Sequence, residues 1–203
     1  WEKATNSLKS ALENQNISYV TAHGEGAFYG PKIDLHVKDA IGRRWQLSTI
    51  QVDFAQPDNF DLQFVDSNNK RVKPVMIHRA LLGSIERFTG ILIENYAGEF
   101  PGWLSPVQVK ILTIGDVSNY LNKITKSLKG FRYEVDDRNL RLGEKLHDAS
   151  KDRIPITLIV GEKDELSNTL AINIRSQDNQ QNVKYEDAIK QIKANLKTPI
   201  FKI

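Results

Sequence analysis

The side chains best suited to chemistry lie in the segment 74–94, PVMIHRALLGSIERFTGILIE, which combines a lone histidine with a later arginine. Residues 75–77 are apolar and predict the end of a buried strand that His78 closes. The helix that should follow is apolar on nearly every side, which indicates burial. Its apolar residues are Ala80, Leu81, Leu82, Ile85, Phe88, Ile91 and Leu92.

Two charged residues interrupt that predicted helix. Charged side chains are rarely buried unless they are paired or bind a ligand, so Glu86 and Arg87 indicate either an ion pair or an anion site. Gly83 and Ser84 come just before them and leave room for a flat ligand near the backbone. Taken singly, His78 is typical of a core histidine and Arg87 of a structural ion pair.

A second set of candidates lies on the strands predicted before His78. The glycine-bracketed turn 26–32 delivers Tyr29 and Lys32 to the start of a strand. Gln46, Thr49 and Gln51 fall among apolar residues, and buried amides and hydroxyls need hydrogen-bond partners. Each residue alone suits a structural role, Lys32 as a solvated lysine and the others as cross-strand partners. Together they could hold an anion and a small polar molecule.

Hydrophobic periodicity predicts the elements that position these residues. Residues 32–38 alternate between polar and apolar, as a half-buried strand does. The strand over 45–54 changes phase near Ser48, which predicts a β-bulge. Residues 60–65 and 72–77 read as a hairpin about the turn 66–69. Long antiparallel strands followed by one helix predict an α+β sheet domain.

The pattern changes after a segment rich in Gly and Pro at 98–106, so we expect one domain over 1–104 and a second over 105–203. Strands and helices then alternate, which predicts a small α/β domain with a mixed sheet. Strands are expected at 107–114, 131–135, 155–160 and 170–174, and helices at 121–128, 142–150 and 188–196, with a polar loop at 176–182.

Composition narrows the possible classes of protein. The chain of 203 residues is 40% hydrophobic and 26% charged, as is usual for globular proteins. No segment approaches the roughly 20 apolar residues of a membrane span. The absence of cysteine excludes disulfides and fits a cytoplasmic protein. The residues after Leu104 include 17 basic and 13 acidic ones, an excess that leans toward an anionic partner. The sequence begins at Trp1 and not at an initiator methionine, so we expect it to be a piece of a longer polypeptide.

The order small–small–apolar–Glu–Arg in the segment 83–87 resembles the third signature motif of class II aminoacyl-tRNA synthetases. The IHRA context of His78 narrows the resemblance to the threonyl-tRNA synthetases. Three segments carry it, GEGAFYGPKIDLHV, WQLSTIQVDF and PVMIHRALLGSIERF, and it extends over the whole chain. It implies the C-terminal part of that family: the end of an antiparallel catalytic sheet followed by an anticodon-binding domain.

The resemblance implies roles for the candidate residues of the first domain. His78 matches one ligand of a zinc ion that selects threonine, whose other ligands, a cysteine and a histidine, lie outside this sequence. Tyr29 and Gln51 match the threonine pocket, and Lys32 and Arg87 match residues of the activation step. Positions around ATP and its Mg²⁺ are matched by Gln46, Thr49, Ser84 and Arg87. Donors of this kind stabilise charge on phosphoryl oxygens.

The resemblance also implies an anticodon reader in the second domain. Asn139 and Arg153 match positions that contact bases, and Asp164, a further anticodon-binding candidate, stands where the family often has glutamate. Asn173 stands where the family has an arginine, and Arg175 lies two residues further on the same strand face. Unpaired bases are read by stacking and by hydrogen bonds to their edges. The implied protein is a cytoplasmic threonine–tRNA ligase that binds tRNA-Thr, threonine and ATP and is a homodimer at full length.

Two other functions fit the sequence. A non-catalytic RNA-binding module could keep the anticodon domain and use the sheet as a scaffold, although such a module has no need of the full set from Tyr29 to Arg87. A class II synthetase for another amino acid, prolyl above all, would lack the FYGPK and IHRA contexts. Because the first two class II motifs and two zinc ligands would precede Trp1, we expect this chain alone to be inactive.

Overall fold

The computed structural model of the protein describes residues 1–200, and the chain forms two compact units, Trp1–Asn95 and Tyr96–Ile203. Residues 96–104, which the sequence places in the first domain, therefore belong to the second unit. Two arginines hold this segment there: Arg132 donates to the carbonyls of Trp103, Ser105 and Pro106, and Arg175 to those of Glu99 and Phe100.

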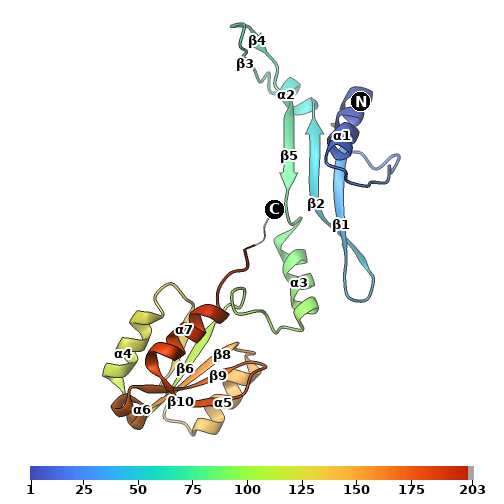
Figure 1. Cartoon of the computed structure of the whole chain (residues 1–203). Helices are drawn as coiled ribbons and strands as arrows, with labels where there is room; N and C mark the ends of the chain where they lie inside the picture. Colours follow the sequence, from blue (N-terminus) through green and yellow to red (C-terminus); the bar gives the residue numbers. More distant parts are fainter. Residues whose placement is uncertain (201–203) are drawn as a thin grey trace. The chain divides into compact units, whose positions relative to one another are not determined.

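The first unit is built on a three-stranded antiparallel sheet in the order β1-β2-β5 (Figure 1). The strands are β1 Lys32–Lys38, β2 Arg44–Asp53 and β5 Met76–Ala80. The remaining elements are α1 Glu2–Asn14, the short helix α2 Ala55–Asn59, the two-residue strands β3 Phe64–Val65 and β4 Arg71–Val72, and α3 Ile85–Tyr96. The expected α+β sheet with antiparallel strands is confirmed.

The bulge predicted from the phase change is present in β2. Asp34 pairs with Thr49 and His36 pairs with Gln46, so one residue of β1 faces Leu47 and Ser48 together. Side chains alternate along a strand, and one extra residue reverses the alternation beyond it. The bulge therefore turns Gln46 to the sheet face that Thr49 occupies.

The hairpin predicted over 60–65 and 72–77 is wrong in extent. Only β3 and β4 pair there, about a turn in which the Asp66 carboxylate accepts the N–H groups of Asn68 and Lys70. Pro74, which has no N–H to donate, separates this pair from β5. The following strand pairs with β2 instead and continues through His78 to Ala80, so His78 lies within a strand and not at its end.

The predicted buried helix is also wrong in its start and its burial. Ala80 is the last residue of β5, and α3 begins only at Ile85. None of its residues is buried in the described chain, and Leu81 and Ile85 are exposed by 60% and 61%. A sequence reveals how apolar a helix is, but burial depends on what packs against it. In residues 1–95 the buried apolar side chains are those of Ala4, Leu47 and Val52, together with Pro31 and Pro57.

The second unit is a five-stranded mixed sheet in the order β10-β9-β8-β6-β7, as the α/β prediction requires. Strands β6 Val109–Ile114, β7 Tyr133–Asp136 and β8 Ile156–Gly161 run parallel, and β9 Thr169–Ile174 and β10 Gln180–Lys184 add antiparallel pairs. The helices are α4 Ser118–Ser127, α5 Leu142–Lys151, α6 Glu162–Ser167 and α7 Tyr185–Asn195. Helix α6 and strand β10 were not predicted because both are almost wholly polar.

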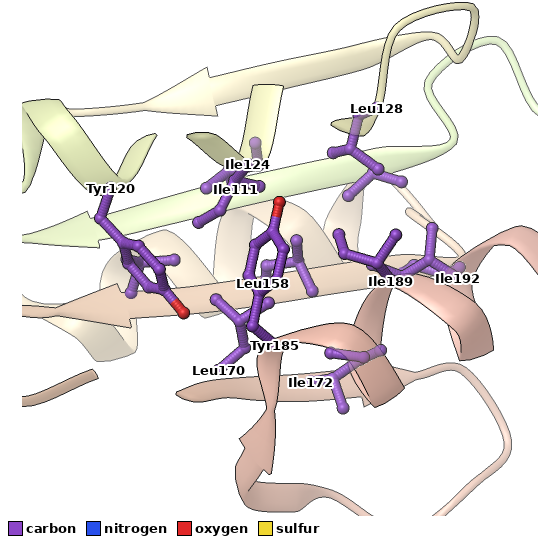
Figure 2. Packing of buried hydrophobic residues seen from close by; sticks show 14 of the residues in the cluster. Ile111, Tyr120, Ile124, Leu128, Leu158, Leu170, Ile172, Tyr185, Ile189 and Ile192 are labelled. Atoms are coloured by element: carbon purple, nitrogen blue, oxygen red, sulfur yellow. The ribbon is translucent and has the colours of Figure 1, made fainter. Parts of the chain in front are cut away.

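The core of the second unit lies between the sheet and the helices α4 and α7 (Figure 2). Ile111 and Leu158 from the sheet meet Ile124 of α4 and Ile192 of α7, and these side chains are fully buried. Helix α5 covers the other face of the sheet (Figure 1), where Leu112 and Ala149 are buried outside this cluster. The second unit thus has a core of its own.

Candidate functional site

The candidate residues of the first unit lie in cross-strand rows on one face of its sheet. Lys32 of β1 is opposite Gln51 of β2, which in turn is opposite His78 of β5. Residues directly opposite each other point to the same face of a sheet. The next row on that face pairs Asp34 with Thr49. Strand register alone therefore gathers residues that are far apart in the sequence.

Asp34, a residue that sequence reasoning overlooked, joins the members of this face. One carboxylate oxygen accepts hydrogen bonds from Gln46 Nε2 and Thr49 Oγ1, both at 2.7 Å, and the other lies 2.5 Å from Lys32 Nζ. Burial would raise the pKa of Asp34, but the hydrogen bond from Lys32 and those from Thr49 and Gln46 lower it below its ordinary value. Asp34 therefore stays ionised and fixes Lys32 beside the two polar side chains.

A second cluster surrounds His78. Tyr29 Oη donates to Gln51 Oε1 at 2.7 Å, and the Tyr29 ring stands edge-on to the imidazole of His78, 5.8 Å between centroids. On the other side of the imidazole, Nε2 lies 2.7 Å from Oδ2 of Asp53, which is fully buried. Burial raises the pKa of Asp53, but the N–H of Gln56 and the imidazole of His78 donate hydrogen bonds that bring it below its ordinary value.

Asp53 is a second functional candidate that the sequence analysis missed. A carboxylate that accepts one imidazole N–H fixes the tautomer and leaves the other ring nitrogen free to accept or to bind a metal. Here Nδ1 is that nitrogen, and the imidazole is 44% exposed. The only available signal was a carboxylate at the end of an apolar strand, VDF, which is equally typical of a turn.

Arg87 and Ser84 lie at the start of α3. The Ser84 hydroxyl accepts the N–H of Arg87, which is the hydrogen bond of a helix N-cap. Arg87 Nη1 donates to the carbonyl of Gln46 at 3.2 Å, and its side chain is otherwise exposed. Gly83, with φ of +68°, approaches the bulge so closely that a Cβ would lie 2.8 Å from the Leu47 carbonyl oxygen. The loop before α3 therefore rests on the bulge that turns Gln46.

The four candidate residues of the second unit fall at opposite ends of strand β8. Asn139 follows β7 and Asp164 follows β8, so both lie at the carboxyl ends of parallel strands. Arg153 precedes β8 and Arg175 follows the antiparallel β9, so both lie at the other end. Six residues of strand span roughly 20 Å. The structure thus brings Arg153 and Arg175 together and separates them from Asn139 and Asp164.

A cavity of about 620 Å³ opens where Arg153 and Arg175 meet, and Thr157 and Asn173 also line it. Arg153 ion-pairs with Glu99 at 3.0 Å, and its carbonyl accepts Arg175 Nη1 at 2.8 Å. The Arg175 guanidinium donates its hydrogen bonds to main-chain carbonyls. Asn173, directly opposite Thr157 in the sheet, lines the cavity. The shape of this cavity therefore depends on Arg175.

Asp164 has a local role in the fold. Its Oδ2 accepts the N–H of Gly161 at 2.9 Å and so closes the first turn of α6, and Thr169 Oγ1 donates to Oδ1 at 3.4 Å. Asn139, in contrast, is exposed in the loop between β7 and α5. These two residues share one end of the sheet but have different surroundings.

The carboxylate of Asp136, the last residue of β7, should make the stability of the second unit depend on pH under acidic conditions. The guanidinium of Arg138 donates to its carboxylate and lowers the pKa of Asp136 to about 2, whereas an unfolded Asp titrates near ~3.9. The folded state therefore gains stability above about pH 4, and this gain is lost as the pH falls from about 4 to about 2. In Asp136→Asn we expect a shallower fall in the free energy of unfolding of the second unit across that window, measured by acid titration of core amide signals. Parallel curves would contradict this assignment.

No helix within residues 1–200 is long and apolar enough to cross a membrane. In the same residues, no group of three or more carboxylate or imidazole side chains is arranged to hold a metal ion. His78 is therefore a candidate for one metal ligand and not for a complete metal site.

Comparisons with known proteins agree with this division. Residues 2–96 match the family described as the tRNA synthetase class II core domain (G, H, P, S and T), and residues 108–195 match the anticodon binding domain. The RNA-binding domain of threonyl-tRNA synthetase from Cryptosporidium parvum Iowa II has a similar structure, with a TM-score of 0.83 and 32% identity over 96% of this chain and 50% of that one.

The chain is also similar in sequence to curated threonine–tRNA ligases. Threonine–tRNA ligase of Clostridium tetani is 51% identical over 87% of this chain and 28% of its own length. The enzyme of Petrotoga mobilis is 48% identical over 97% of this chain and 31% of its own length. The chain thus spans about 30% of the length of the curated relatives that it matches. By the two matched domains, it belongs to the class II aminoacyl-tRNA synthetases, with part of the core domain followed by an anticodon-binding domain.

Proposed function

We propose that this chain is part of a threonine–tRNA ligase, in which its first unit contributes to the site for threonine and ATP and its second unit binds the anticodon of tRNA-Thr. The observation that carries the proposal is the sheet face that joins Tyr29, Gln51 and His78 in hydrogen-bonding or ring contact, backed by the buried Asp53. The threonine–tRNA ligases named above support the choice of amino acid.

The two clusters of the first unit suit different parts of the reaction. The hydroxyl and amide of Tyr29 and Gln51 are fixed by their mutual hydrogen bond and can receive the polar groups of an amino acid. Lys32, held by Asp34, and Arg87 at the start of α3 supply positive charge. In adenylate formation such charges stabilise the phosphoryl oxygens of ATP, which binds with Mg²⁺. Gln46 and Thr49 supply further polar groups beside Lys32 and Arg87: both donate to Asp34, which holds Lys32, and the Gln46 carbonyl accepts Arg87 Nη1.

His78 fits one position of a zinc site. Its Nε2 is bonded to the buried Asp53 carboxylate, so Nδ1 is the nitrogen able to bind a metal, an arrangement common among zinc-bound histidines. A zinc ion there would act as a Lewis acid toward the amino and hydroxyl groups of threonine. Threonine differs from the isosteric valine in that hydroxyl, which is the basis on which a polar site can select it.

Two measurements test the proposal on the 203-residue chain. Fluorescence anisotropy should detect binding of labelled tRNA-Thr, with lower affinity for the same tRNA carrying a changed anticodon and a steep loss of affinity with salt. Equal affinity for every anticodon would refute anticodon reading. ATP–pyrophosphate exchange with threonine should stay at background for this chain alone, since no group of three or more possible metal ligands occurs among the residues described. Robust exchange would refute the view that the site is incomplete.

A further inference from the structure

The loop that carries Asn139 is fastened at its beginning, middle and end to a single helix, α5. At its beginning, the carbonyl of Asp136 accepts Lys145 Nζ at 3.1 Å. In its middle, Arg138 Nη2 lies 2.7 Å from the carboxylate of Asp148. At its end, the N–H of Arg141 donates to the Glu144 carboxylate at 3.3 Å. The three helix residues lie within about one turn of one another and so present one surface to the loop.

Lys145 is the buried member of this set, with 2% of its surface exposed. Its ammonium group also donates to the carbonyl of Thr113 at 2.8 Å, so it joins the carboxyl ends of the neighbouring strands β6 and β7. Buried charges are retained only where hydrogen bonds compensate their loss of hydration. These two bonds fix the point at which the chain leaves the sheet and enters the loop.

The Asp136 side chain completes the arrangement on the other side of the loop. It accepts hydrogen bonds from the main-chain N–H, Nε and Nη2 of Arg138, so the two residues before Asn139 cannot turn independently. Asn139 itself is exposed beyond this network. The loop is therefore held rigidly up to the residue that points outward, which is the condition for a side chain that must meet a base edge in one orientation.

We propose that Lys145 is a positioning residue for anticodon recognition, which acts by holding the loop 137–141 so that Asn139 faces the nucleic acid. This inference rests on the proposed function of the second unit, because Lys145 is buried and makes no contact with a partner itself. It predicts that Lys145 and Asn139 are coupled in RNA binding although only Asn139 is exposed.

A double-mutant cycle on the full 203-residue chain tests the coupling. Lys145→Met keeps the length of the side chain and removes its donors, and it should weaken tRNA-Thr binding about tenfold, as the loss of one charge-assisted hydrogen bond would. Asn139→Ala should weaken binding to a similar extent, and adding Lys145→Met to it should weaken binding no further. Additive losses would overturn the proposal, since they would mean that Lys145 does not act through Asn139.

Controls separate this role from general charge and from folding. Lys190→Met removes one positive charge from the exposed surface of α7, on the other face of the sheet. It should leave the coupling between Lys145 and Asn139 in tRNA-Thr binding unchanged. Asp148→Asn loosens the loop from the exposed side, so it reports on the network even if Lys145→Met unfolds, and it should also weaken binding only when Asn139 is present. Equal losses from Asp148→Asn with and without Asn139 would overturn the proposal.

Amide hydrogen exchange tests, without RNA, whether Lys145 holds the loop 137–141. Lys145→Met should raise exchange at residues 137–141 while the strand β8 stays protected. If no variant binds tRNA-Thr, the proposed function fails, and this exchange pattern still shows whether Lys145 holds the loop. Unchanged exchange in the loop would overturn the inference even where tRNA binding is anticodon-dependent.

Discussion

Replacing Gly30 by alanine is expected to destabilise the first unit by about 2–3 kcal/mol, the cost of forcing an extra methyl group into a packed position. A Cβ at this position would lie 1.8 Å from the carbonyl oxygen of Val52. The atoms around this position belong to the backbone of β2. Two hydrogen bonds hold that backbone against the turn, from Val52 N–H to the Pro31 carbonyl at 3.0 Å and from Phe54 N–H to the Tyr29 carbonyl at 3.3 Å. The turn or β2 must therefore move.

The consequence for the site follows from the same contacts. The turn that holds Gly30 also places Tyr29 next to Gln51, so a displaced turn should break the hydrogen bond between them. Hydrogen exchange should show faster exchange of the Val52 and Phe54 amides in Gly30→Ala, and thermal unfolding should show the lost stability. Gly90→Ala is the matched control, since nothing beyond its own helix backbone and chain neighbours lies within 4 Å of a Cβ there and alanine is favoured within a helix. Equal stability of the two variants would contradict the close approach.

Periodicity was sufficient to predict the positions of the long strands. The reversal of alternation within 45–54 correctly predicted a bulge, because the period of a strand is so regular that one extra residue is visible in the sequence. Polar elements gave no such signal: α6 and β10 carry few apolar residues and were missed. Burial of α3 was predicted wrongly because its apolar surface is a property of the sequence, whereas burial requires a neighbour.

The sites show a similar limit. Residues whose type is unusual for their place, such as His78 among apolar residues, could be singled out from the sequence. Asp34 and Asp53 could not, since a carboxylate in or beside a strand is ordinarily a solvated residue, and only the side-chain contacts in the structure show that they hold Lys32 and His78. The contacts of Arg175 with three carbonyls were equally hidden, because main-chain acceptors leave no mark in a sequence.

Arg153→Gly is expected to weaken binding of tRNA-Thr about tenfold or more, as the loss of a charge-assisted contact would, while stability stays unchanged or rises by up to about 1 kcal/mol. Arg153 follows the end of α5 with φ of +54°, and its N–H bonds to the Ser150 carbonyl while Ile154 N–H bonds to that of Ala149. This is the helix ending in which glycine is favoured. An arginine at a strained position indicates a functional role for its side chain.

The ion pair with Glu99 makes this prediction specific, because only the loss of Arg153 should weaken RNA binding. Glu99→Gln releases the Arg153 guanidinium and removes a negative charge beside the cavity, so affinity for a polyanion should stay equal or rise. The pair is exposed and adds little to stability, about 0–1 kcal/mol. Anisotropy and thermal unfolding of both variants measure the two effects. If both variants lost affinity equally, the pair would act by shaping the cavity, and Arg153 would not contact the RNA.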